Sequence, residues 1–112
     1  IFVAHGGGYL PSYSGRIDHA WGARPDCAGF NLKHKPTDYL KRMYFDTVVF
    51  SFDQLKYLID KFGSNHIIMG TDYPYDMAED DPIEHVLGVK ELSEIDIELI
   101  TGKNACSLFK IK

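Results

Sequence analysis

Short apolar runs alternate along this chain with stretches in which apolar residues recur at helical spacing. The runs Ile1–Ala4, Met43–Asp46 (with an alternative end at Phe50) and His66–Gly70 predict three strands. Runs this short and this apolar are typical of strands buried in a parallel sheet. Because helical stretches follow each run, the order predicts an α/β fold built from about three β-α units.

The helices are predicted from spacing and from residues that start or stop them. A stripe of apolar side chains predicts a helix over about residues 10–23, which Pro25 ends. Pro36 opens a short helix after a loop over residues 25–35. The clearest amphipathic stripe precedes Gly63 and consists of Leu55, Leu58, Ile59 and Phe62. Three further helices are predicted over residues 83–92, from Ser93 to Gly102, and after a cap at Asn104.

Two titratable side chains follow predicted strands directly. His5 ends the first strand and precedes Gly6–Gly8, and Asp72 follows the third strand. The glycines allow a sharp turn and a close approach of the backbone to a ligand. In a right-handed β-α-β arrangement both strand ends point to the same face of the sheet. Each residue alone has a structural explanation, as a buried histidine or as a turn cap, but the repeated placement favours a functional site.

Three other polar side chains have two explanations each. Asp46 falls near the end of the second strand, and we favour a turn cap over a direct role in the site. Arg16 and Arg24 lie eight positions apart, so they project to similar sides of the first helix. They are either solvated side chains, the usual fate of helical arginine, or a pair of anion clamps near the mouth of the site.

Composition narrows the function classes without choosing one. The 112 residues are 45% hydrophobic, which suffices for a packed core, and no apolar run approaches the length of a membrane span. The net charge of -4, without long runs of either sign, argues against nucleic acid and anionic membranes as partners. Cys27 and Cys106 share no pairing motif, so we expect free thiols and a cytoplasmic protein. Since the first residue already lies inside an apolar run, we expect a piece of a larger polypeptide.

Several stretches together resemble one enzyme family. They are HGGG at residues 5–8 with the following Gly15-Arg16-Ile17, Trp21 and Arg24-Pro25-Asp26, then YFDTVVF at 44–50, IMGTDYP at 68–74 and GKNA at 102–105. This set resembles the aminocarboxymuconate-semialdehyde decarboxylase group of the amidohydrolase superfamily over essentially the whole chain. The separation of HGGG and GTDYP is fairly specific for the decarboxylase-like branch, and much less so for any one substrate.

The resemblance implies a metal-dependent (β/α)₈ barrel of the TIM type, of which residues 1–112 form the C-terminal segment of a single domain. It implies that Asp72 ligates a divalent metal, zinc in most relatives, and that His5 activates water or moves a proton at the substrate. Arg16 and Arg24 match arginines that hold substrate carboxylates, one of them across the interface of a homodimer, and Trp21 lines the same region. The implied reaction is loss of carbon dioxide from a small unsaturated or aromatic carboxylate.

Part of the family's ligand set has no counterpart in this sequence. The HxH pair after the first barrel strand and the histidine after the fifth are both absent. Because zinc takes three protein ligands, the chain alone is expected to be inactive. Two alternatives stay open: a hydrolase that uses the same His5, Asp72 and metal, and a non-catalytic module that self-associates through unpaired sheet edges.

Overall fold

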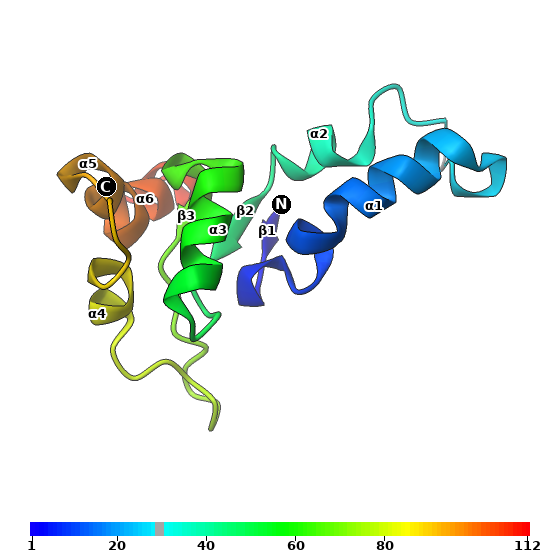
Figure 1. Cartoon of the computed structure of the whole chain (residues 1–112). Coiled ribbons are helices and arrows are strands. Elements are labelled where there is room, and N and C mark those ends of the chain that lie inside the picture. Colours follow the sequence, from blue (N-terminus) through cyan, green and yellow to red (C-terminus); the bar gives the residue numbers. More distant parts are fainter. Residues whose placement is uncertain (29–30) are drawn as a thin grey trace.

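The chain folds around a small parallel sheet, as the alternation of strands and helices predicts. The computed structural model describes residues 1–28 and 31–112 (Figure 1). The strands are β1 (Phe2–Val3), β2 (Tyr44–Asp46) and β3 (Ile67–Ile68), in the order β1-β2-β3. Both pairings are parallel, with Val3 opposite Phe45 and Asp46 opposite Ile68. The carboxyl ends of all three strands therefore lie along the same side of the sheet, which we call the carboxyl edge.

Helices fill the connections between the strands and the segment after them. The longest are α1 (Leu10–Ala23) and α3 (Phe52–Phe62), and the shorter ones are α2 (Pro36–Leu40), α4 (Pro82–Leu87), α5 (Glu94–Glu98) and α6 (Asn104–Phe109). Single 3₁₀ turns lie at His5–Gly7, Pro25–Cys27 and Ser64–His66. None of the helices in the described part of the chain combines the length and the apolar character that a bilayer crossing needs.

The core lies where α3 packs on the sheet and on the C-terminal helices. Phe45 of β2 is fully buried, and its ring stacks on that of Phe62 at a centroid distance of 4.4 Å. The predicted stripe of α3 forms the centre of this core, where it meets Ile67, Val86, Val89 and Ile100. Ser51 caps α3 by accepting a hydrogen bond from the amide of Gln54, and Gly63 follows its last residue. The amphipathic helix is thus confirmed from its cap to its end.

The prediction that the first strand is buried is wrong for this chain. Ile1 is 84% exposed and Phe2 is 42% exposed. The strands β2 and β3 are buried as predicted, and Phe45 and Ile67 belong to the core. β3 is an outer strand like β1, but α3 and the C-terminal helical segments pack on it, whereas Ile1 and Phe2 lie outside the core.

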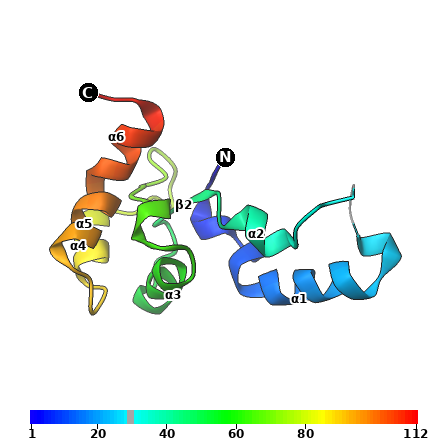
Figure 2. The same cartoon turned by 90° about the horizontal axis from the view of Figure 1, so that it is seen from above.

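The first helix is confirmed over residues 10–23, but Arg24 does not belong to it. Arg24 has extended backbone angles beyond the last turn, and α1 runs away from the sheet in both views (Figure 1, Figure 2). An α-helix rises about 1.5 Å per residue, so the far end of α1 lies roughly 20 Å from its first turn. Arg16 and Arg24 therefore do not project from one helix face as their spacing predicts.

The predicted break at Gly102 is also wrong. The backbone remains helical from α5 through a π-helical segment, Leu99–Lys103, into α6. Asn104 does not cap a new helix, because its side-chain amide donates to the carbonyl oxygens of Ser64 and Ile67, both at 2.7 Å. Asn104 thereby fastens α6 to the start of β3, and this long-range contact overrides the local capping signal.

The capping box at the start of α5 yields a prediction about pH. The Asp96 carboxylate accepts hydrogen bonds from the Ser64 hydroxyl at 2.6 Å and from the Ser93 amide at 3.1 Å. These bonds, that of Ser64 above all, hold the pKa of Asp96 below its usual value. A carboxyl with a lowered pKa stabilises the fold above its unfolded-state pKa, and this contribution is lost as the pH falls through the folded-state pKa.

Ser64→Ala is expected to raise the pKa of Asp96 toward its usual value, because the strongest hydrogen bond to the carboxylate is removed. Carboxyl-detected NMR titration of the full-length protein that carries this chain measures the shift. Ser12→Ala is the matched control, since the Ser12 hydroxyl donates only to the Tyr9 carbonyl. An unchanged Asp96 titration in Ser64→Ala would show that the hydroxyl does not hold the carboxylate.

Candidate active site

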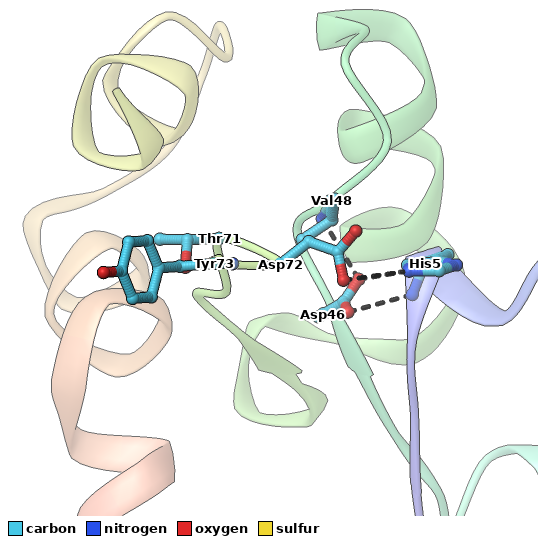
Figure 3. Close-up of polar contacts among 7 residues, drawn as sticks. His5, Asp46, Val48, Thr71, Asp72 and Tyr73 are labelled. Atoms are coloured by element: carbon cyan, nitrogen blue, oxygen red, sulfur yellow. Dashed lines mark hydrogen bonds and ion pairs between the residues drawn. The ribbon is translucent and has the colours of Figure 1, made fainter. Parts of the chain in front are cut away.

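One histidine and two aspartates lie together at the carboxyl ends of the three strands. His5 follows β1, Asp46 is the last residue of β2, and Asp72 follows β3 (Figure 3). They come from points 26 to 67 residues apart in the sequence, and the parallel register places them together. The expectation that His5 and Asp72 lie at the same face of the sheet is confirmed.

His5 and Asp72 face each other across the carboxyl edge. The imidazole Nε2 lies 3.4 Å from Asp72 Oδ1, at the long end of hydrogen-bond distance. The His5 side chain is 63% exposed and that of Asp72 is 26% exposed. The pair is therefore open to a ligand, and its loose contact leaves both groups free to bind or to exchange a proton with one.

The glycines after His5 serve a steep turn in the left-handed region. The φ angles are 55° at His5, 60° at Gly6 and 82° at Gly7. A Cβ on Gly7 would lie 2.7 Å from the ring of the buried Phe45, so this turn lies directly against the core. Left-handed backbone costs a side-chain-bearing residue about 1–2 kcal/mol, which His5 bears and the glycines avoid.

Gly7→Ala is expected to lower the free energy of unfolding by at least about 2 kcal/mol, because backbone strain and overpacking against Phe45 add together. The matched control is Gly15→Ala in α1, where a Cβ meets nothing within 4 Å and φ is ordinary. That change is expected to be neutral or to stabilise by up to about 1 kcal/mol. Denaturant unfolding of the full-length variants tests both signs, and equal effects would contradict the packing argument.

Asp46 lies beneath the pair and is buried, with 6% of its surface exposed. Its Oδ2 accepts a hydrogen bond from the His5 amide at 2.9 Å, and its Oδ1 accepts from the amides of Gly6 at 2.8 Å and Val48 at 3.0 Å. The prediction that Asp46 caps a turn is confirmed by its bond to the amide of Val48, two residues later. Two of its three bonds, however, reach a turn about 40 residues earlier in the sequence.

Asp72 is held by a turn of its own. Its backbone has a φ of 64°, a conformation that aspartate tolerates better than most residues. The amide of Tyr75 donates to the Asp72 carbonyl at 3.0 Å, and the amide of Tyr73 donates to the Thr71 hydroxyl at 3.1 Å. The backbone thus aims the carboxylate toward His5, while the Tyr73 side chain points away from it (Figure 3).

A cleft of about 320 Å³ opens at the pair and is lined by His5, Val48, Phe50, Asp72 and Met77. A larger cleft of about 710 Å³ between α3 and α4 shares only Phe50 with it. We assign the site to the smaller cleft because it contains the facing His5 and Asp72. The sequence does not indicate Phe50 and Met77 as residues of the cleft, because both lie in connections without periodicity.

The other predicted site residues lie on or beyond α1, away from this cleft. Arg16 is exposed, Trp21 is partly buried, and neither lines the cleft. Arg24 forms a bidentate pair with Asp26, at 3.1 and 2.8 Å, and this partner raises the pKa of the guanidinium. Within the described residues, the structure therefore brings His5 and Asp72 together and leaves Arg16, Trp21 and Arg24 apart from them.

Asp72 has the chemistry of a metal ligand, because a carboxylate oxygen facing an open cleft suits a divalent cation. Residues 1–28 and 31–112 contain no group of three or more His, Cys, Asp or Glu side chains that could hold a metal ion. Asp72 fits such a site as one ligand, and the other ligands would have to come from outside these residues.

No family model matches the chain. Two curated relatives do, and both are named 2-amino-3-carboxymuconate-6-semialdehyde decarboxylase. The protein from Dictyostelium discoideum is 36% identical over 105 residues, which cover 94% of this chain. The protein from Caenorhabditis elegans is 35% identical over 111 residues, which cover 99% of it. The matches span only 29% and 28% of the relatives' own lengths.

Among solved structures, the chain is also similar to decarboxylases. The chain matches 5-carboxyvanillate decarboxylase from Sphingomonas paucimobilis with a TM-score of 0.84 and 27% identity, over 100% of this chain and 34% of that one. It matches a dihydroxybenzoic acid decarboxylase from Polaromonas with a TM-score of 0.82 and 29% identity. This match covers 99% of this chain and 33% of the decarboxylase chain. The Polaromonas structure holds manganese and the inhibitor 2-nitroresorcinol. The resemblance to the aminocarboxymuconate-semialdehyde decarboxylases that the HGGG and GTDYP stretches indicate is therefore confirmed over nearly the whole of this chain and about three-tenths of theirs.

Proposed function

We propose that the protein carrying this chain is a metal-dependent decarboxylase acting on a small unsaturated or aromatic carboxylate. The observation that carries the proposal is that His5 of the HGGG stretch and Asp72 of the GTDYP stretch face each other at 3.4 Å. The names of the relatives support the substrate class, because they act on an unsaturated carboxylate or on aromatic ones.

We propose that these 112 residues are the C-terminal segment of one (β/α)₈ barrel and supply its last three β-α units. The parallel order β1-β2-β3, with helices in the connections, and the exposed outer strand β1 support this arrangement. A complete barrel takes about 250 residues, more than twice the 112 of this chain, so the chain can supply only part of one. The exposed, unpaired Cys27 and Cys106 support a cytoplasmic location.

Asp72 is proposed to hold a divalent metal, and zinc is the ion we propose, with manganese as the ion found in the Polaromonas relative. When bound, such a metal supplies a Lewis acid that polarises substrate oxygens and lowers the pKa of coordinated water. His5 is proposed to transfer a proton at the substrate, since histidine changes charge near neutral pH and its ring lies open to the cleft. Phe50 and Met77 add apolar side chains to the wall of the cleft.

Arg16 and Arg24 are proposed to bind the substrate carboxylate, one of them in the site of a second copy, with Trp21 lining the same region. Arginine suits this task because its guanidinium binds carboxylates bidentately, as Arg24 binds Asp26 here. Because α1 carries Trp21 and Arg24 away from the cleft, we propose that the intact protein is a homodimer in which this end of α1 reaches the partner.

Analysis of reaction products tests the proposal. The full-length protein is incubated with 2-amino-3-carboxymuconate-6-semialdehyde and with hydroxylated benzoates, the carboxylates that the relatives' names point to. We expect one of them to release carbon dioxide and leave a product that lacks one carboxyl group. Two fragments with water added would identify a hydrolase and overturn the decarboxylase assignment.

A further inference from the structure

We propose that Asp46 is a positioning residue, which fixes His5 for proton transfer by binding its backbone. The inference rests on the proposed function of His5 and adds a residue to that site. Asp46 is a buried residue, 6% exposed, and its carboxylate accepts hydrogen bonds only from backbone amides among the described residues. Removing a carboxylate from water is costly, so its retention at this place requires strong compensating bonds.

The bonds of Asp46 are divided between its two oxygens. Oδ2 binds the His5 amide alone, whereas Oδ1 binds the amides of Gly6 and Val48 (Figure 3). Oδ2 therefore holds the backbone of His5 itself, and Oδ1 joins the turn after β1 to the connection after β2. Gly70 after β3 also lies against Asp46, since a Cβ there would be 3.3 Å from the Asp46 Cβ.

Among the described residues, the His5 backbone has one further hydrogen bond of the turn, from the Gly8 amide to the His5 carbonyl at 3.0 Å. Its φ of 55° is unfavourable for a residue with a side chain, and β1 pairs on one side only. Its ring makes a single polar contact in the described structure, the loose one to Asp72. The bond from Oδ2 thus fixes the backbone from which the ring projects into the cleft.

The division between the oxygens makes Asp46→Asn a selective test. The asparagine Oδ1 can still accept from Gly6 and Val48, but its Nδ2 would face the His5 amide as a second donor. The opposite orientation would break two bonds instead of one. The substitution therefore removes the bond to His5 while it keeps the two that join the turns.

The expected result is a fall in kcat of about 10- to 100-fold with KM and metal content nearly unchanged. In a His5→Ala background, Asp46→Asn is expected to have no further effect on kcat, because its influence passes through the imidazole. A purely structural Asp46 would give the same factor in both backgrounds and would overturn the inference. Asp96→Asn is the control for lost capping, since it breaks the box of α5 far from the cleft, and kcat should be unchanged.

Two further outcomes separate this inference from the proposed function. If His5→Ala retains full activity, the proposed role of His5 is overturned, and the inference about Asp46 with it. If His5→Ala loses activity but Asp46→Asn retains it, only the positioning role of Asp46 is overturned. Should Asp46→Asn not fold, hydrogen exchange of the wild-type protein decides the matter. We expect the His5 amide to be protected although its side chain is exposed, and rapid exchange of that amide would overturn the inference.

Discussion

Replacing His5 by alanine is expected to lower kcat by about 10²- to 10⁴-fold, the range that loss of a positioned general acid or base produces. The reason is geometric, because the His5 ring lies 3.4 Å from the Asp72 carboxylate and lines the cleft. Metal content should stay at the wild-type level, since His5 is proposed as a proton carrier and not as a ligand. Steady-state kinetics and elemental analysis of the full-length variant measure the two quantities.

The matched control for this change is His34→Ala. His34 is an exposed histidine that does not line the cleft and whose ring lies beside Tyr39, at a centroid distance of 6.3 Å, so its loss should leave kcat unaltered. Normal turnover in His5→Ala would remove His5 from the mechanism. Lost metal together with lost turnover would instead make His5 a ligand.

Replacing Asp72 by asparagine is expected to weaken metal binding by more than about 100-fold, because changes to outer-shell partners alone cost about 10- to 100-fold. Asparagine keeps the shape of the side chain and tolerates the φ of 64°, so the turn should persist. Loss of metal is therefore attributable to the missing charge and not to a collapsed loop. Turnover should fall with metal occupancy.

Asp76→Asn provides the control for Asp72→Asn, since Asp76 is exposed in the same connection and does not line the cleft. It should bind metal as the wild-type protein does. Full metal occupancy in Asp72→Asn, measured by elemental analysis after dialysis, would exclude Asp72 from the ligand set.

The sequence predicts the parts of this fold that depend on local pattern. The stripe and caps of α3 are read directly from spacing, and so are the three strand ends with His5, Asp46 and Asp72. These features succeed because period and capping chemistry act within a few residues.

Features that depend on distant contacts are not predicted. Ile1 and Phe2 are exposed because they lie outside the core that α3 forms with β2 and β3, and no apolar run reveals this. Asn104 looks like a cap but binds carbonyls 37 and 40 residues away, so the helix continues through Gly102. Likewise Asp46 has the signature of a turn cap, whereas its bond to His5 exists only once β1 and β2 are paired.

The central claim is that the cleft at His5 and Asp72 belongs to a metal-dependent decarboxylase. The most direct test measures carbon dioxide release by the full-length protein before and after removal of its metal with a chelator, and again after zinc or manganese is restored. We predict that release stops with the metal and returns with one of the two ions. Undiminished release from the metal-free protein would contradict the account.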